Sequence, residues 1–276
     1  MSVDLTWLRF ALLAAVAIGL PPISHAATLQ KLDWGSPDQP WGTRRAVTAA
    51  NRAAIAAYRP GRKAPIFSTN FSGTAELQAD WNVVSDDNRS LTSCRRPASV
   101  EPSTAGLRLK TLLATDCHSA RWSTGYIASK ARYGYGFVEA RIKIADIKGV
   151  NNAVWLTTAD NFEIDIAEAR YPNYVHLGLQ YWPPNKTEQH AGMGWGASFA
   201  ENLAYGFHDV GLLRTPTDMI YEVDGEPIAA VLTHGAVRGP AAILISTALA
   251  DWAGGKVPDH PENHGMVVQW LHVFAP

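Results

Sequence analysis

The sequence contains little charge and no excess of either sign. Charged residues make up 18% of its 276 positions, and 24 basic residues face 25 acidic ones, so the formal net charge is -1. A chain this close to neutrality lacks the basic surface that binds a nucleic-acid backbone, so nucleic acid is not expected as a partner. The sequence also lacks a phosphate-binding loop, a Rossmann glycine fingerprint and a G-x-S-x-G nucleophile elbow. We therefore expect no cofactor.

The sequence has no apolar stretch long enough to cross a bilayer, which takes ~20 residues. An apolar run over residues 10–20 follows Arg9 and is ended by Pro21-Pro22 and by the small-residue stretch 24–26. This order of features predicts a secretory signal peptide over residues 1–26, and the alternative is a buried N-terminal helix. We expect a secreted or periplasmic protein with no membrane span after signal cleavage.

Cysteine is scarce, with a single pair at Cys94 and Cys117. In an oxidising compartment such a pair tends to be bonded, so we expect a disulfide, with two buried thiols as the alternative. The bond would contribute roughly 3 kcal/mol by constraining the unfolded chain. No metal site is expected, because Pro261 prevents a helix between His260 and His264, which otherwise have a metal-like spacing.

Turn residues and aromatic residues are abundant, with 22 Gly, 17 Pro and 10 Trp. Apolar side chains alternate with other residues over 137–144, 175–182 and 266–274, which is the period of a β-strand. Asp224-Gly225 separates two further alternating runs and predicts a type I′ hairpin turn. Many short strands between turns indicate an all-β sandwich or jelly roll.

The N-terminal part of the chain has a different composition. An Ala-rich stretch over 45–58 predicts one short helix, which Pro60-Gly61 would end. We therefore divide the chain into a signal peptide over 1–26, an N-terminal extension over 27–64 and one domain over 65–276. A domain of that length is large enough to bury a two-sheet core.

Three carboxylates lie within six residues, at Glu163, Asp165 and Glu168. In a regular strand Glu168 would point away from the other two, but a β-bulge at Ile166-Ala167 would return it to their face. Crowded carboxylates do not all ionise, so one keeps its proton near neutral pH. Such a group suits retaining glycoside hydrolysis, which needs a nucleophile and an acid/base about 5–5.5 Å apart. The alternative is a helical turn with an exposed acidic edge, in which Glu163 and Glu168 would not converge.

The motif E-I-D-I-A-E at 163–168 resembles the E-x-D-x-x-E signature of glycoside hydrolase family 16 in its bulged form. Further segments resemble strands of that family in the same order, over about 65–276. These segments are 133–143, 152–156, 207–211, 221–227 and 266–274.

The resemblance implies a concanavalin-like β-jelly roll of two curved antiparallel sheets. It assigns Glu163 as the nucleophile, Glu168 as the general acid/base and Asp165 as the assisting carboxylate, whereas the residues alone do not decide between the two glutamates. It implies a glycosidase that cleaves β-linked glucans or galactans with retention. Together with the predicted signal peptide, we expect a secreted, endo-acting monomer that cleaves β-1,3- or β-1,3-1,4-glucan. The alternatives are a β-galactan (agarose-type) hydrolase, a transglycosylase and a non-catalytic glycan-binding jelly roll.

Polysaccharide binding requires aromatic rings for the sugar faces and polar side chains for the hydroxyls. We expect the rings on a strand near the acids and in glycine-rich loops, and the polar groups on neighbouring strands. The predicted substrate-binding residues are Trp155, Trp195, Trp252, His176, Gln180 and Glu139.

The sequence departs from the family pattern at four residues. Asn151-Asn152 stands where many β-glucan-cleaving members have Trp-Pro, which is why galactan stays open. Gln180 replaces a second histidine that is usual in glucanases. Gln269 replaces an acidic residue of the frequent calcium site, so calcium is not predicted.

Overall fold

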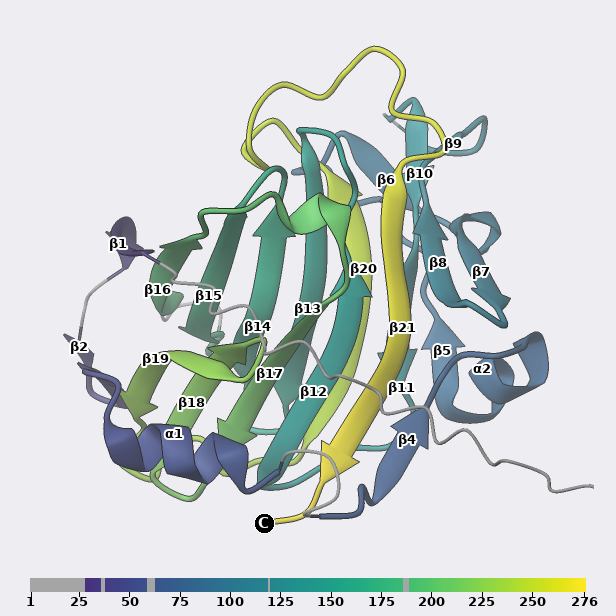
Figure 1. Cartoon of the computed structure of the whole chain (residues 1–276). Coiled ribbons are helices and arrows are strands. Elements are labelled where there is room, and N and C mark those ends of the chain that lie inside the picture. Colours follow the sequence, from purple (N-terminus) through teal and green to yellow (C-terminus); the bar gives the residue numbers. More distant parts are fainter. Residues whose placement is uncertain (1–27, 36–37, 59–62, 119, 186–188) are drawn as a thin grey trace, which may run out of the picture.

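The computed structural model describes residues 28–35, 38–58, 63–118, 120–185 and 189–276 (Figure 1). The predicted signal peptide over 1–26 lies outside the described residues. Two large antiparallel sheets pack face to face, which confirms the predicted all-β jelly roll.

The first sheet has eight strands and carries the acidic motif. Its order is β1 (Thr28–Gly35), β16 (Ala191–Ser198), β15 (Tyr174–Tyr181), β14 (Phe162–Arg170), β13 (Val150–Thr158), β20 (Ala241–Leu249), β11 (Tyr126–Ser129) and β5 (Trp81–Val83).

The second sheet has ten strands and lies in front of the first in Figure 1. Its order is β2 (Asp38–Gln39), β3 (Gly42–Arg45), β19 (Glu226–Leu232), β18 (Asp218–Val223), β17 (His208–Arg214), β12 (Gly136–Lys143), β21 (Gly265–Phe274), β8 (Gly106–Lys110) and β7 (Val100–Ser103), with β4 (Phe67–Thr69) paired to β21. A small third sheet contains β6 (Ser93–Arg95), β10 (Trp122–Thr124) and β9 (Leu112–Leu113).

The main core lies between the two large sheets and follows the alternation of the strands. Ile164 and Ile166 of β14 are fully buried there, and Val210 and Leu212 of β17, the strand of the other sheet that approaches β14, belong to the same cluster. Removing this apolar surface from water, at about 25 cal/mol per Å², is the main term that holds the sheets together. The opposite face of β14 is left for polar side chains.

The hairpin predicted at Asp224-Gly225 is confirmed. The two residues join β18 to β19 and have φ values of 50° and 77°. A type I′ turn requires positive φ at both central positions, which glycine and aspartate tolerate better than most residues.

The predicted N-terminal helix is present but shorter, as α1 (Ala49–Ala56). Thr48 forms a capping box with Asn51, and Ile55 packs on Phe137 at the outer face of the ten-stranded sheet. A second helix, α2 (Thr74–Asp80), was not predicted. Strands β1 and β3 of the N-terminal extension pair with β16 and β19, and β2 pairs with β3, so the extension adds one strand to the first sheet and two to the second.

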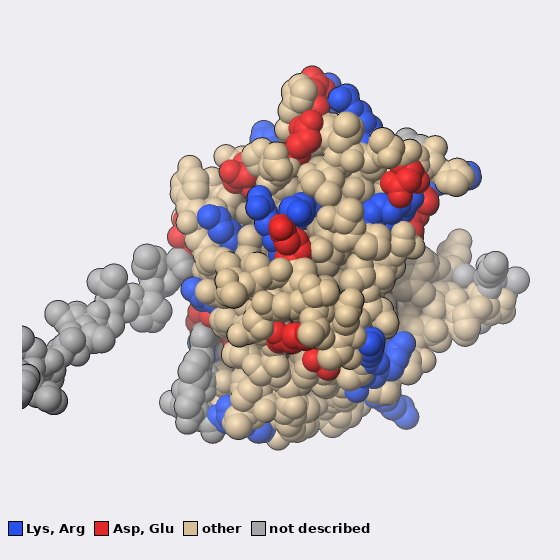
Figure 2. Space-filling model, turned by 90° about the vertical axis from the view of Figure 1, so that its right-hand side faces the viewer, with Lys and Arg blue, Asp and Glu red and all other residues tan. Residues whose placement is uncertain are grey.

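The surface mixes charges of both signs. On the face shown in Figure 2, Lys and Arg alternate with Asp and Glu and form no extended patch of one sign. In the described part of the chain, no helix has the length and apolar composition that a membrane crossing needs.

Candidate active site

The acidic motif occupies β14, and the predicted bulge is confirmed. Val154 pairs with Ala167 and Trp155 pairs with Asp165, so Ile166 is the extra residue opposite β13. The pairing with β15 shifts between Asp165 and Glu168 in the same way. The bulge returns Glu168 to the face of Glu163 and Asp165, and all three carboxylates line one cleft.

The cleft lies on the outer face of the eight-stranded sheet and has a volume of about 290 Å³. Its floor comes from β13, β14 and β20, and its walls come from the loops after β5, β15 and β20. Besides the three acids, the lining residues are Asn88, Ser90, Leu91, Arg95, Asn151, Ala153, Trp155, Trp182, Ser246, Ala248 and Trp252.

Glu168 is held by three side chains from three strands. His176 Nδ1 lies 2.5 Å from its Oε2, and Asn151 Nδ2 donates to its Oε1 at 2.5 Å. Arg170 Nη2 lies 3.5 Å from Oε2, and both side chains of this pair are less than one-fifth exposed. The carboxylate is therefore fixed in one orientation and surrounded by groups that favour its charged form.

Glu163 and Asp165 both accept a hydrogen bond from the same side chain, Gln180. Gln180 Nε2 donates to Glu163 Oε1 at 2.9 Å and to Asp165 Oδ2 at 3.0 Å. His190 Nε2 lies 2.8 Å from Gln180 Oε1, which orients the amide. Asp165 sits against Gly178 on β15, where a β-carbon would overlap its Oδ2. The predicted residues His176 and Gln180 thus both contact the acids.

The environment separates the pKa values of the three acids. Burial, and then the charges of Glu168 and Glu163, raise the pKa of Asp165 to about 8. Burial and Glu168 likewise raise the pKa of Glu163 to about 7, although a hydrogen bond with Trp182 opposes the rise. Burial also acts on Glu168, but His176, Arg170 and Asn151 outweigh it and lower its pKa. At neutral pH, Asp165 is mostly protonated and Glu168 carries the charge.

An aromatic stack forms the floor beside the acids. Trp155 stacks on Tyr126 with centroids 5.8 Å apart, and its Nε1 donates to Ser246 Oγ at 3.2 Å. The guanidinium of Arg95 lies 4.6 Å above the Tyr126 ring and is paired with Asp86 at 2.7 Å. The stacking on Tyr126 and the hydrogen bond to Ser246 therefore fix the orientation of the Trp155 ring, as is needed for a ring that supports a sugar.

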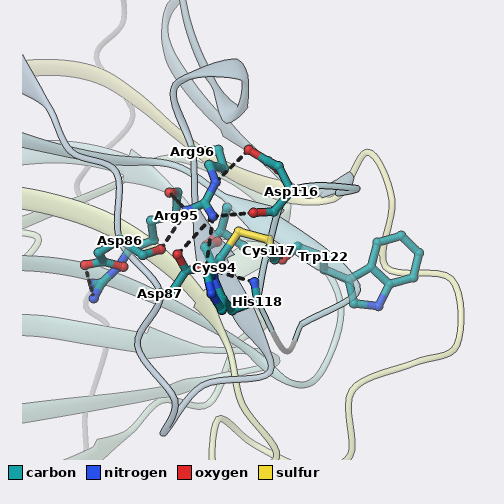
Figure 3. Close-up of polar contacts among 10 residues, drawn as sticks. Asp86, Asp87, Cys94, Arg95, Arg96, Asp116, Cys117, His118 and Trp122 are labelled. Atoms are coloured by element: carbon teal, nitrogen blue, oxygen red, sulfur yellow. Dashed lines mark hydrogen bonds and ion pairs between the residues drawn. A yellow bond between two sulfur atoms is a disulfide. The ribbon is translucent and has the colours of Figure 1, made fainter.

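The wall formed by Asn88 to Leu91 follows directly after Asp87, which is ion-paired with Arg96 (Figure 3). The Arg96 guanidinium donates to Asp87 and to Asp116, each at 2.9 Å. The predicted Cys94–Cys117 disulfide is confirmed and lies next to this ion-pair group. The bond and the ion pairs tie the wall to the segment that carries Asp116.

Two tryptophans border the cleft on its other sides. The predicted Trp252, which follows β20, is 50% exposed, and Trp182, which follows β15, is 48% exposed. The Arg170 guanidinium lies 4.9 Å from the Trp252 ring, so one arginine contacts both that ring and Glu168. Trp182 stacks on His190 at 3.9 Å.

Two predicted substrate-binding residues lie elsewhere. Trp195 is buried in β16 and packs on Tyr221 between the sheets, because the glycines beside it are strand positions and do not form a loop. Glu139 is buried in β12 on the outer face of the ten-stranded sheet, which it shares with Phe137. Its side chain points to the outer face of the other sheet, and therefore away from the cleft.

Ser246 in the cleft and Arg170 behind Glu168 were not predicted from the sequence, and Asn151 was noted only as a departure from the family pattern. Arg170 lies two residues after Glu168, so equal parity in the strand was the available signal. Ser246 gave no signal, because its contact with Trp155 comes from the pairing of β13 with β20.

Besides Asp87 with the disulfide-bonded Cys94 and Cys117, two groups of side chains in the described part of the chain have a composition that could bind a cation. They are Asp165, Glu168 and His176 in the cleft, and Glu201, His208 and Asp224 at the β17–β18 end of the other sheet. In the second group Asp224 already accepts from the Asp209 amide and lies 2.8 Å from His208 Nδ1. In each of these two groups the histidine already has a carboxylate partner, Glu168 for His176 and Asp224 for His208.

Comparisons with known proteins relate this site to a family. The model of a family described as glycosyl hydrolases family 16 matches residues 85–272. An endo-1,3-1,4-beta-glycanase from Rhizobium meliloti (strain 1021) is 25% identical over 205 residues, which is 72% of this chain and 41% of the relative. The chain thus spans about two-fifths of the length of that curated relative.

Solved structures share the fold at low identity. LamAcat from Zobellia galactanivorans has a TM-score of 0.66 and 16% identity, over 76% of this chain and 97% of its own. The laminarinase catalytic domain from Thermotoga maritima MSB8 has a TM-score of 0.67 and 14% identity, over 77% and 98%. The family match covers more than half of the chain and includes the cleft acids. The chain therefore belongs to glycosyl hydrolases family 16.

Proposed function

We propose that this protein is an endo-acting glycosidase that cleaves a β-linked polysaccharide with retention. The observation that carries the proposal is the convergence of Glu163, Asp165 and Glu168 on one face of β14, inside a cleft bordered by tryptophans. The relatives include an endo-1,3-1,4-beta-glycanase and a laminarinase, which supports β-1,3- or β-1,3-1,4-glucan as the substrate.

In the proposed double displacement, Glu163 attacks the anomeric carbon while Glu168 protonates the departing oxygen. Glu168 then removes a proton from water, and this water displaces Glu163 from the sugar. Asp165, kept protonated by burial, stabilises the charged form of the nucleophile beside it. Trp155 supports the sugar ring next to the reacting bond.

One observation favours the opposite assignment of the two glutamates. The lowered pKa of Glu168 makes it the more readily ionised carboxylate, and the raised pKa of Glu163 suits a proton donor. With the roles proposed above, the proton must lie on Glu168 when the sugar is bound. The nucleophile therefore has to be identified by experiment.

Azide rescue of the Glu163→Ala and Glu168→Ala variants identifies the nucleophile. With an activated β-glycoside, azide replaces a missing nucleophile directly and gives an α-glycosyl azide. If the acid/base is missing, azide displaces the sugar from the intact nucleophile and gives a β-glycosyl azide. We expect the α-product from Glu163→Ala and the β-product from Glu168→Ala. The reverse pattern would exchange the roles, and rates near the unaltered protein in both variants would refute the site.

Reducing-end release on laminarin, mixed-linkage glucan, agarose, carrageenan and xyloglucan tests the substrate. We expect cleavage of laminarin or mixed-linkage glucan. Cleavage of agarose would instead support the galactan alternative, for which Asn151 beside Glu168 is the specific observation. Glu163→Gln serves as the matched control, since it keeps the shape of the side chain and removes its charge.

We also propose that the protein is exported. The predicted signal peptide and the Cys94–Cys117 disulfide support export. N-terminal sequencing of the mature protein should show that residues 1–26 have been removed.

A further inference from the structure

A second hollow lies at one end of the ten-stranded sheet, apart from the catalytic cleft. Its volume is about 670 Å³, compared with about 290 Å³ for the cleft. It lies where β8, the end of β12 and the start of β21 meet the short 3-10 helix Leu203–Tyr205. Its size falls in the range of small-ligand sites.

An exposed aromatic ring borders this hollow. Tyr205 is 84% exposed, and the other exposed aromatic side chains among the described residues are Trp182 at 48% and Trp252 at 50%, both at the catalytic cleft. The backbone beneath Tyr205 is fixed, because Leu203 and Ala204 are buried and Asn202 caps the Ala204 amide at 2.9 Å. The ring is therefore presented to solvent on a rigid support, and its face is available to a ligand.

The remaining wall consists of polar side chains held in place by their neighbours. His264 Nδ1 lies 2.6 Å from Asp146 Oδ1, and Arg108 donates to the Asn263 carbonyl at 3.0 Å. Lys143 lies close enough to help lower the pKa of Asp146. A ring face beside both donors and acceptors matches the two needs of a sugar, whose C–H face stacks and whose hydroxyls form hydrogen bonds.

The two hollows are connected by one loop. The segment 250–264 between β20 and β21, the long yellow loop in Figure 1, carries Trp252 at the catalytic cleft. Its other end carries Asn263 and His264, which line the second hollow. A polymer bound in the hollow at one end of this loop is thus held near the cleft at its other end.

We propose that the second hollow is a polysaccharide-binding site for a segment of the polymer outside the cleft. This inference rests on the proposed function, since the ligand class is the β-linked polysaccharide that the cleft cleaves. A sugar ring stacks on Tyr205, and Arg108, Asp146 and His264 contact its hydroxyls. Binding at the second site raises the local concentration of polymer at the cleft. It does not increase the affinity for a substrate that is too short to reach both sites.

Native gels containing each of the five polysaccharides measure binding, with Glu163→Gln as the background so that the polymer stays intact. Tyr205→Ala should raise the apparent Kd for the retained polymer about tenfold, the size of a central aromatic contact. Leu113→Ala is the matched control, since it also removes an exposed apolar side chain but lies outside both hollows. In the otherwise unaltered protein, Tyr205→Ala should raise KM for the polymer and leave kcat/KM for a short oligosaccharide unchanged.

Unchanged retention of Tyr205→Ala would overturn the inference, as would an equal effect of Leu113→Ala. Equal loss of activity on short and long substrates would also overturn it, because it would show that Tyr205 acts through the fold. If a polymer is retained through Tyr205 but none is cleaved, the second site stands and the proposed function fails. If a polymer is cleaved and Tyr205→Ala leaves its retention unchanged, the function stands and the second site fails.

Discussion

The variant Asp165→Asn should become more stable relative to the unaltered protein as the pH rises. Asp165 is 5% exposed, and burial raises its pKa to about 8 in the folded state. In the unfolded chain an aspartate has a pKa of about 3.9. Between these values the folded protein holds a proton that the unfolded chain releases, so stability falls as pH rises. Asparagine has the shape of the protonated acid and cannot ionise, so the variant does not lose this stability as the pH rises.

The size of the effect follows from the width of that interval. One proton held by the folded state alone costs about 1.4 kcal/mol of unfolding free energy per pH unit. Between pH 5 and pH 7.5 the difference between Asp165→Asn and the unaltered protein should therefore widen by about 3 kcal/mol. A difference between two pH values cancels any constant change that the substitution makes to packing or to the Gln180 hydrogen bond.

Urea unfolding followed by tryptophan fluorescence at pH 5, 6, 7 and 7.5 provides the measurement. Asp259→Asn is the matched control, because Asp259 is exposed and remote from the acids. Its stability should run parallel to that of the unaltered protein at every pH. If Asp165→Asn also runs parallel, Asp165 is ionised in the folded state and the ionisation order described above is wrong.

Further predictions concern activity and the disulfide. Cleavage needs one proton on the glutamate pair, and the pair releases it with the pKa of about 7 of Glu163. The value of kcat/KM should therefore fall about tenfold per pH unit well above pH 7, and a constant value up to pH 9 would contradict this. Gly178→Ala should displace Asp165 and lower kcat by about 100-fold with an unchanged circular dichroism spectrum, whereas Gly134→Ala, where a β-carbon meets nothing within 4 Å, should keep normal activity. Reducing the Cys94–Cys117 bond should lower the unfolding free energy by about 3 kcal/mol, measured by urea unfolding with and without reductant; equal curves would show that the bond adds no stability.

Features that depend on neighbouring residues were predictable from the sequence. The alternation in β12, β15 and β21, the turn at Asp224-Gly225 and the bulge at Ile166 each follow from the geometry of one strand or hairpin. The bulge was predictable because the three acids can share a face only with one extra residue. The family resemblance extended these local predictions to the whole jelly roll.

Features that depend on how the two sheets pack together were not predictable from neighbouring residues. Trp195 lies between two glycines and Trp252 lies two residues before Gly254, yet the first fills the core against Tyr221 and the second borders the cleft. Glu139 alternates with core residues as a cleft residue would, but β12 belongs to the other sheet. Parity gives two faces, and only the packing of the sheets decides which face is the cleft.

The chemistry of the cleft depends on the same kind of information. The motif places three acids together, but their ionisation order is set by contacts with other residues. Asn151 comes from β13 and His176 from β15, and both hold Glu168 in the form that carries charge. Gly178 of β15 leaves room for Asp165 where it is buried. The number of carboxylates is therefore a property of one strand, whereas the choice of the one that keeps its proton is a property of three adjacent strands.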